Sequence, residues 1–251
     1  MRILKHSVPY VLALVAIGAV WQIAVWVSQA NVAILPPPLL TLSTLWDLIV
    51  SGELAKHTVA SLSRVISAWG LSVLVAVPLG LAMARSKTVE SLLDPVIELF
   101  RPISPLAWIP LAILWFGIGE TGKIFIIFVA TFFPILLNTV SGVKGVDPVM
   151  IRAGRVLGCD NEVSLFLRVI LPAAMPTIIV GLRIAFGTGW AAIIAAELVA
   201  AQSGLGYLIA DGMEILRSDL VLAGMIAIGV LGVLIDSVFR VIGKRYDWGP
   251  A

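Results

Sequence analysis

The side chains that most often carry out chemistry are few in this chain. It has one cysteine, Cys159, and two histidines, His6 and His57. A single cysteine forms neither an internal disulfide nor a thiolate cage for a metal. The sequence has no Ser–His or paired-Asp arrangement within its apolar segments and no Gly-x-x-x-x-Gly-Lys-Ser/Thr phosphate loop. We therefore predict no catalytic residue, no metal site and no cofactor bound by the chain itself, which disfavours an intramembrane enzyme.

Composition indicates the environment in which the chain folds. Of the 251 residues, 60% are hydrophobic and 13% are charged, against roughly 45–50% and roughly 25% in soluble domains. The mean hydropathy is +1.06. A soluble domain of this size has too little interior to bury so much apolar surface. The sequence therefore predicts a membrane protein, and a net charge of +2 gives no reason to expect a nucleic-acid partner.

Six apolar segments are long enough to cross a bilayer, for which about 20 residues are needed. They predict an all-α polytopic membrane protein with a single domain over residues 1–251. The segments are about 9–28, 58–84, 92–116, 124–143, 177–199 and 220–243. The first follows Arg2 and Lys5 as a signal peptide would, but its apolar run is longer than that of a secretory signal. We expect it to be an uncleaved span.

Basic residues set the predicted orientation. If the N-terminus is cytoplasmic, four basic residues fall outside, namely Lys56, Arg64, Lys123 and Arg217. Thirteen fall inside, which are Arg2, Lys5, Arg85, Lys87, Arg101, Lys144, Arg152, Arg155, Arg168, Arg183, Arg240, Lys244 and Arg245. This bias follows the positive-inside rule. Both termini are therefore predicted to be cytoplasmic.

Small residues recur where helices must pack together in lipid, since close backbone approach and not burial from water joins helices there. The second span carries a ridge at every fourth position, made of Ala68, Ser72, Ala76, Gly80 and Ala84. The fifth span has Gly181, Ala185 and Gly189, and the sixth has Gly224 and Gly232. These spans are predicted to contact other helices in a compact bundle.

The third span is interrupted by Pro95, Pro102, Pro105 and Pro110. Each proline removes a backbone donor and disfavours helix before it. Two interpretations are open at this point. The segment is a broken helix that lines protein or a water-filled path, or it is a helix that starts near Leu106 after a cytoplasmic approach.

Two connections carry their own helical patterns. Outside, Leu39–Val50 predicts a short helix, which lies either in the membrane interface or packed against the bundle. Residues 200–219 are read as an outer connection rich in glycine and charge. Inside, within residues 144–176, Asp147 and Pro148 mark the start of a helix that ends at Gly158. A second helix is predicted to begin at Asp160 and to end at Pro172.

This inner connection resembles the coupling motif of binding-protein-dependent ABC importer permeases. The motif reads Glu-Ala-Ala, three residues, Gly, nine residues, Ile-x-Leu-Pro. Here Arg152, Ala153, Gly154 and Gly158 are followed by Ile170, Leu171 and Pro172. Arg152 stands in place of the glutamate, and the spacer is one residue longer than in the family pattern. Further segments resemble the nitrate, sulfonate, taurine and bicarbonate branch, namely Ile34–Pro38, Phe100–Leu111, Leu114–Gly119, Phe133–Thr139 and Ser203–Gly206.

The resemblance implies a six-span subunit of the MetI-like type I permease fold in the bacterial cytoplasmic membrane. It also implies a homodimer, two cytoplasmic ATPase subunits that carry ATP and Mg, and a periplasmic or lipid-anchored binding protein. The seven motif residues would form the ATPase-coupling loop, and the transported nutrient would be a small anion. Aliphatic sulfonates or taurine are the first hypothesis, since Trp115–Gly119 looks most like that group.

Polar residues at membrane depth are the remaining functional candidates. Arg183 and Glu197 in the fifth span are about 21 Å apart by helical rise, so they are not predicted to pair. Together with Asp236 they are assigned gating or structural roles. The predicted pore residues are Thr131, Asn138, Thr188 and Trp190, with interhelical packing as the alternative for each. A secondary transporter or channel working without ATP is the alternative function, but we find neither paired intramembrane carboxylates nor an inverted repeat.

Overall fold

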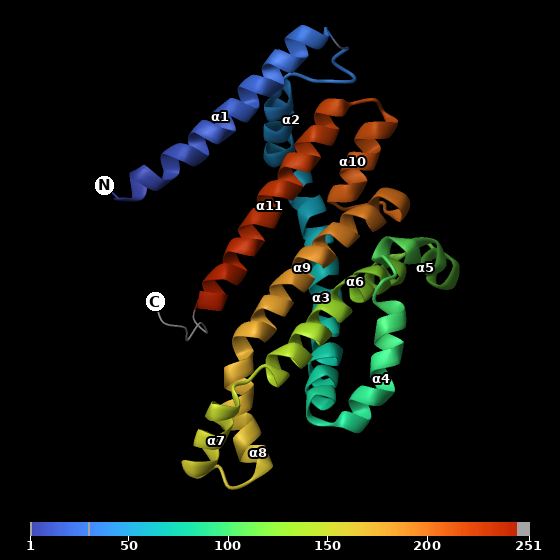
Figure 1. Ribbon diagram of the computed structural model, residues 1–251. Coiled ribbons are helices and arrows are strands. Elements are labelled where there is room, and N and C mark those ends of the chain that lie inside the picture. The colour runs from blue at the N-terminus through green and yellow to red at the C-terminus, as the bar shows by residue number, and fades with distance from the viewer. Residues whose placement is uncertain (1, 30, 245–251) are drawn as a thin grey trace.

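The structure is a computed structural model that describes residues 2–29 and 31–244, and within them all side chains except those of residues 2–11, 14, 200 and 244. Every regular element in these ranges is helical. In chain order the elements are α1 Arg2–Ser28, α2 Pro38–Val50, α3 Glu53–Arg85, α4 Lys87–Phe100, η1 Pro105–Trp108, α5 Ile109–Phe116, α6 Glu120–Lys144, α7 Pro148–Val156, α8 Glu162–Leu165, η2 Phe166–Ile170, α9 Leu171–Ala200, α10 Leu205–Glu214 and α11 Ser218–Lys244 (Figure 1).

Four helices are long and apolar enough to cross a membrane. They are Glu53–Arg85, Glu120–Lys144, Glu162–Val199 and Ser218–Gly243, and they coincide with the second, fourth, fifth and sixth predicted spans. A bent pair made of α4 and the segment Pro105–Phe116 would make a fifth if the two helices are counted as one span. The predicted first span begins at residue 9, among residues whose side chains are not described. The apolar stretch of α1 that can be compared with it is Val15–Ser28. The count of six spans stays a prediction.

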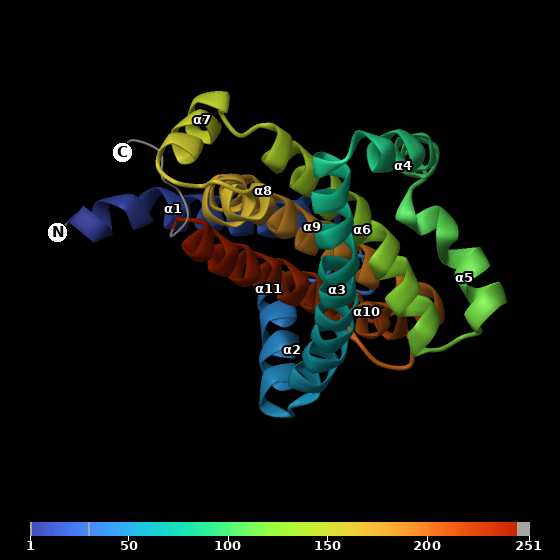
Figure 2. The same cartoon turned by 90° about the horizontal axis from the view of Figure 1, so that it is seen from below.

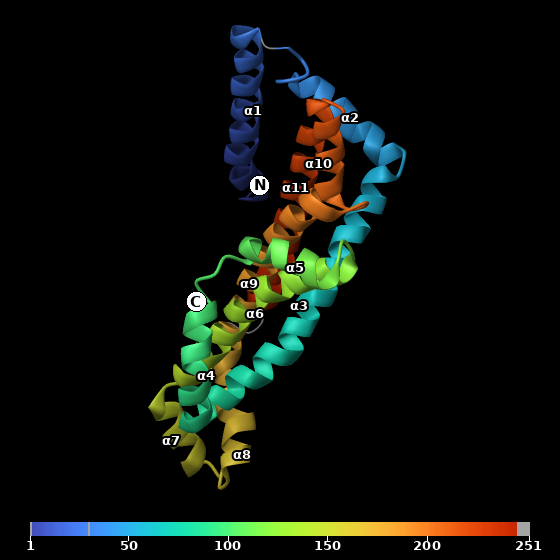
Figure 3. The ribbon, with the colours of Figure 1, turned by 90° about the vertical axis from the view of Figure 1, so that its right-hand side faces the viewer.

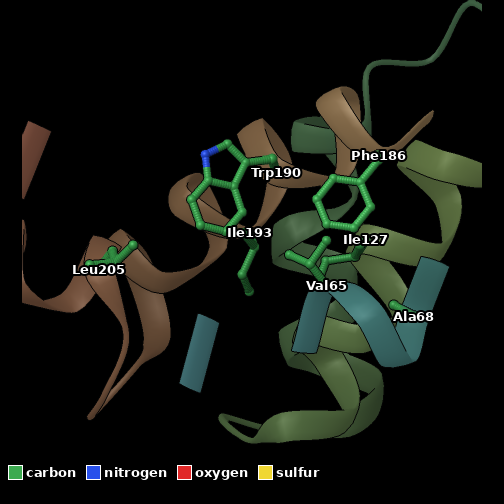
Figure 4. Packing of buried hydrophobic residues seen from close by; sticks show 7 residues of the cluster. All are labelled: Val65, Ala68, Ile127, Phe186, Trp190, Ile193 and Leu205. Atoms are coloured by element: carbon green, nitrogen blue, oxygen red, sulfur yellow. The ribbon is translucent and has the colours of Figure 1, made fainter. Parts of the chain in front are cut away.

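The centre of the bundle is formed by α3, α6 and α9, which lie side by side in Figures 1 and 2. Small residues of the predicted ridges make this close approach possible. A Cβ atom on Gly80 would lie 2.8 Å from Thr139 Cβ, and one on Gly189 would lie 2.7 Å from Thr131 Cγ2. Around them packs an apolar cluster of Val65, Ala68, Ile127, Phe186, Trp190, Ile193 and Leu205 (Figure 4).

The predicted third span is divided into two helices. Helix α4 and the segment Pro105–Phe116 are bent by 82° relative to one another, and the chain between them forms no regular helix at residues 101–104. Pro102 and Pro105 lack amide protons, and Ser104 before Pro105 is extended, with φ −57° and ψ 134°. Helical structure resumes at Pro105, near the start at Leu106 that the second interpretation predicted, and the approach before it is itself helical from Lys87 to Phe100.

On the side predicted to be cytoplasmic, α7 begins and ends as its residues indicate. The Asp147 carboxylate accepts a hydrogen bond from Val149 N at 2.7 Å, and Gly158 has φ +95°. The prediction that Pro172 ends the following helix is wrong. From Glu162 to Val199 the chain forms one continuous helical segment, with a π-helical turn at Phe166–Ile170. Such a wide turn accommodates the backbone carbonyl that Pro172 cannot pair with.

On the side predicted to be outer, the connection 200–219 contains a helix that we did not predict. Helix α10 buries Leu205, Leu208 and Ile209 against its neighbours. Helix α2 packs against α11, where Thr44 Oγ1 donates a hydrogen bond to Asp219 Oδ2 at 2.7 Å. Trp46 on the other face of α2 is exposed. Together α2 and α10 cover the outer ends of α3 and α11 (Figure 1).

Candidate functional site

A cluster of four charged side chains joins α3, α6 and α9 near their outer ends. We call Arg64, Glu120, Lys123 and Glu197 the outer cluster. Arg64 Nη1 lies 2.6 Å from Glu197 Oε1, and Arg64 Nε lies 2.5 Å from Glu120 Oε2. Lys123 Nζ reaches Glu120 Oε1 at 3.0 Å. Because Arg64 is 7% and Glu197 1% exposed, this ion pair is shielded from solvent and restricts the three helices to one arrangement.

The loop Ser203–Gly206 completes the outer cluster with backbone groups. Arg64 Nη1 donates to Ser203 O at 2.7 Å, and Gly206 N donates to Glu197 Oε2 at 3.0 Å. Ser61 Oγ donates to the Glu197 carboxylate and accepts a hydrogen bond from Leu205 N at 2.8 Å. The structure thus gives the sequence motif at 203–206 a physical role, which is to hold a buried carboxylate.

A second ion pair joins α9 to α11. Arg183 Nε and Nη2 lie 2.5 and 2.9 Å from the Asp236 carboxylate oxygens, and Arg240 Nη2 lies 2.7 Å from Asp236 Oδ2. The pair lines a small cavity with Phe186, Trp190 and Phe239. Of the three candidate gating residues, Arg183 and Asp236 therefore meet each other, whereas Glu197 belongs to the outer cluster.

Beside the break in the third span lies a larger cavity of about 420 Å³, which we call the break cavity. Its polar lining consists of Arg101, Asn138 and Thr188. Apolar residues form the rest, namely Ile103, Pro105, Val129, Ala130, Phe133, Pro134 and Leu137. Asn138 Nδ2 donates to Pro134 O at 2.8 Å, and Thr188 Oγ1 donates to backbone carbonyls of Ala130 and Ala185.

The four predicted pore residues are thus divided among three places. Asn138 and Thr188 line the break cavity. Thr131 is fully buried between α3 and α6, where its Oγ1 lies 2.6 Å from Ser72 Oγ. Trp190 is 8% exposed, and its Nε1 donates to Ile228 O at 3.4 Å on α11. The structure brings together the first two residues only.

Two basic residues that we counted on the cytoplasmic side lie beside the middle of long apolar helices. For Arg183 this agrees with its predicted place in the fifth span, whereas Arg101 was not expected there. Arg101 lines the break cavity together with residues from the middle of α6, and Arg183 lies in the middle of α9. Sequence reasoning placed Arg101 at the surface because the prolines around it resembled an inner loop. The predicted orientation keeps its direction without these two residues, since the inner side still carries most of the basic residues.

At the inner end, α7 packs on the helix that leads into α9. Gly154 is buried there, and a Cβ atom on it would lie 2.7 Å from Val169 Cγ2. A groove of about 420 Å³ follows this contact, lined by residues that include Ala153, Gly154 and Pro172. Arg152 and Gly158 are exposed, whereas Ile170 and Leu171 are half-buried. Val156 and Leu157 project outward with 87% and 85% exposure.

Within the described residues, no group of three or more His, Cys, Asp or Glu side chains is arranged to hold a metal ion. The outer cluster, the break cavity and the α7 groove offer hydrogen bonding, ion pairing and apolar contact. The outer cluster joins the start of α6 at Glu120 to the end of α9 at Glu197. The α7 groove lies at the end of the molecule that holds α7 and α8 (Figure 3). The break cavity is lined by the middle of α6, between these two places. This arrangement is suited to a path across a membrane.

Comparison with known proteins agrees with this arrangement. Residues 76–248 match the model of the family described as binding-protein-dependent transport system inner membrane component. The chain is 42% identical to a putative ABC transporter permease of Methanocaldococcus jannaschii over 250 residues, 97% of this chain and 91% of the relative. It is 41% identical to the taurine transport system permease of Escherichia coli over 231 residues (90% and 84%). Identity to the nitrate import permease of Leptolyngbya laminosa is 31% over 253 residues (97% and 89%). The chain therefore belongs to the family of inner membrane components of binding-protein-dependent transport systems.

Proposed function

We propose that this chain is the permease subunit of an ABC importer that moves a small anion, with taurine or an aliphatic sulfonate as the first choice. The observation that carries the substrate class is the similarity at 41% identity to the taurine permease and at 39% to an aliphatic sulfonate permease of Escherichia coli. Nitrate and bicarbonate belong to the same chemical class of small oxyanions. The transporter would work by alternating access between the two sides of the membrane.

The proposed assembly has two copies of this chain, two cytoplasmic ATPase subunits and a binding protein outside. ATP and Mg would be bound by the ATPase subunits, and this chain would bind no cofactor. In support, α7 exposes Val149, Met150, Val156 and Leu157, an apolar set that is characteristic of a surface covered by a partner. The motif residues Arg152 to Gly158 and Ile170 to Pro172 would make this contact.

Force from the ATPase subunits would travel through the helix from Glu162 to Val199. One end of this helix packs on α7 through Val169 and Gly154, and the other end carries Glu197 of the outer cluster. A rigid element of 38 residues joins the inner partner surface to the outer ion pairs. A shift of α7 would therefore displace Glu197 relative to Arg64, which couples ATPase closure to the outer end of the path.

We place the assembly in the cytoplasmic membrane of a bacterium, with both termini of the chain inside. In that orientation the binding protein would dock on the outer ends of α2, α3 and α10. A cavity of about 570 Å³ lies there, and its lining includes Asp47, Lys56, Asp211 and Arg217. Side chains of both signs suit a transient polar interface between two proteins.

Purification of the tagged chain from its native membranes in mild detergent tests the assembly. We expect an ATPase with a phosphate loop to co-purify in a one-to-one ratio with this chain. A stable chain that purifies alone while it still transports in vesicles without ATP would contradict the assignment and favour a secondary transporter or channel.

The substrate is tested separately, by uptake of labelled taurine into cells with and without the gene for this chain. We expect deletion to abolish the uptake that the cognate binding protein supports. Uptake of taurine and ethanesulfonate that is unchanged on deletion would exclude sulfonates, and the same cells would then be assayed with nitrate and bicarbonate.

A further inference from the structure

We infer that Arg101 and the break cavity form an anion-binding site within the translocation path. The site takes an organic oxyanion such as a short-chain sulfonate. The inference rests on the proposed function, because it assigns a substrate contact within the proposed path. It adds a residue that sequence analysis had placed in the cytoplasmic approach.

The depth of the break cavity is the first observation. Its α6 lining extends from Val129 to Asn138, and α6 itself extends from Glu120 to Lys144. The cavity therefore lies beside the middle of a membrane-spanning helix, away from both of its ends. Helix α4 carries the chain there from the end of the bundle that holds α7 and α8 (Figure 3), and Arg101 follows its last residue.

The charge of the break cavity is the second observation. Its lining contains Arg101 and no acidic residue. The other two arginines in the middle or outer part of the spans, Arg64 and Arg183, are each paired with carboxylates at 2.5–2.9 Å. Among the described residues, no carboxylate lies within ion-pair distance of Arg101. An unpaired cation at this depth is costly, which makes it a functional candidate, and a transported anion would neutralise it.

The shape and polarity of the break cavity indicate which anion. A guanidinium presents a planar fork of donors that matches two oxygens of a sulfonate or carboxylate. Asn138 has a second amide hydrogen beyond the one that it donates to Pro134 O. The remaining lining is apolar, with Ile103, Phe133 and Leu137 among it. At about 420 Å³ the space is within the usual range of ligand pockets, roughly 300–1,000 Å³, so a short hydrocarbon chain fits beside the anionic group.

The site is suited to weak, reversible binding of a transported anion and not to tight binding. Arg101 is exposed and lines the cavity, so an anion held by its guanidinium keeps part of its hydration. It also lies at the junction between α4 and the bent segment Pro105–Phe116, where a change in the bend would move the guanidinium relative to Asn138 on α6. Conduction needs contacts that are weak enough to be released.

The test uses the complete transporter, with its ATPase and binding protein, in proteoliposomes loaded with ATP. Arg101→Gln, Arg101→Lys and Arg101→Glu are compared for uptake of labelled taurine, and Lys87→Gln is the matched control. Lys87 is an exposed cation at the other end of α4. We expect Arg101→Gln to lower the maximal uptake rate by about ten- to a hundredfold, as loss of a hydrogen bond to a charged group predicts. Arg101→Lys should retain part of the uptake rate, and Arg101→Glu should abolish uptake. The control Lys87→Gln should transport at the parental rate.

Half-saturation by loaded binding protein should stay unchanged in Arg101→Gln, and so should the ATPase rate that the binding protein stimulates. Uptake by Arg101→Gln at the parental rate would overturn the inference and leave the proposed function intact. Failure of the parent itself to import taurine would instead contradict the proposed substrate. Loss of uptake together with loss of stimulated ATPase in all three variants would show a structural role for Arg101 and would also overturn the inference.

A chemical restoration of charge separates binding from folding. Cys159 is the one cysteine of the chain, so Arg101→Cys can be introduced in a Cys159→Ser background as a single reactive thiol. Methanethiosulfonate ethylammonium would restore a cation at this position and should recover uptake. The ethylsulfonate reagent, which has the same length and the opposite charge, should not. Equal recovery, or no recovery, with both reagents would contradict an anion site.

Discussion

Arg64 on α3 and Glu197 on α9 form an ion pair in which neither partner is open to solvent: Nη1 and Oε1 are 2.6 Å apart, with exposures of 7% and 1%. The two residues are 133 positions apart in the chain. Each has further partners, since Arg64 also binds Glu120 and Ser203, and Glu197 also binds Ser61 and Gly206. These hydrogen bonds and ion pairs fix the positions of both side chains within the bundle.

Neutralising Glu197 should destabilise the subunit strongly. In Glu197→Gln the Arg64 guanidinium stays buried and loses its charged partner on α9. Removal of one member of a buried pair costs about 3–5 kcal/mol, which should appear as a large fall in the thermal denaturation midpoint of the purified complex. Glu162→Gln is the control, because its pair with Arg155 is 65% and 60% exposed and such surface pairs contribute about 0–1 kcal/mol. Equal midpoints in the two variants would show that the outer cluster adds no stability.

Gly204 is required beside Glu197 for two reasons. Its φ is +122°, and a Cβ atom there would lie 2.2 Å from Glu197 Cδ and Oε1. Gly204→Ala should therefore destabilise the complex as much as loss of the ion pair does. Gly52 also has a positive φ, +79°, but has nothing within 4 Å of a Cβ atom. Gly52→Ala should cost only the backbone strain, about 1–2 kcal/mol. Gly204→Ala should lower the midpoint further, through displacement of the carboxylate together with the greater strain at Gly204, whose ψ is 169°.

Local periodicity predicted those parts of the fold that depend on neighbours along one helix. The ridge from Ala68 to Gly80 could be found from its spacing alone, because residues four apart share a helix face. The same holds for the start of α7 at Asp147 and its end at Gly158, whose signals lie within one turn of the helix end. Each of these features requires only a few adjacent residues to be read together.

Pairing across helices could not be read from the sequence. Arg64 was counted as a surface charge because its partners Glu120 and Glu197 are more than 50 residues away. Arg101 was misplaced for a related reason, since the depth of a broken span depends on how α4 packs beside α6. Pro172 was predicted to end a helix, but a π-helical turn at Phe166–Ile170 lets the helix continue through it. No residue pattern in the sequence indicated that turn. One feature of the sequence could have indicated that Arg64 is buried. It lies on the helix that carries the small-residue ridge, in a segment with few other charges.

A charge on the turn after α7 should interrupt coupling without unfolding the subunit. Nothing lies within 4 Å of a Cβ atom on Gly158, whose φ is +95°. Gly158→Ala adds strain alone and should keep the ATPase bound after purification. Gly158→Asp adds similar strain and a carboxylate at the exposed turn beside Leu157, so we expect the ATPase to be lost or its activity to become independent of the binding protein. Normal ATPase recovery and transport in Gly158→Asp would show that this turn does not contact the ATPase.

The approach of α9 to α6 should decide whether the break cavity keeps its shape. A Cβ atom on Gly181 would lie 2.3 Å from Asn138 Cβ and 3.3 Å from Pro134 O, so the two backbones must separate in Gly181→Ala. Overpacking of this kind costs about 1–3 kcal/mol. Because Asn138 lines the break cavity, uptake should fall by more than the lower folded fraction explains.

Gly187 on the same helix provides the matched control, because nothing lies within 4 Å of a Cβ atom there. Gly187→Ala should leave uptake unchanged and raise stability by up to about 1 kcal/mol, the usual difference between glycine and alanine within a helix. The measurement is the initial rate of taurine uptake per folded complex, with the folded amount taken from size-exclusion chromatography. If Gly181→Ala and Gly187→Ala transport at the same rate, the contact between Gly181 and Asn138 does not shape the path.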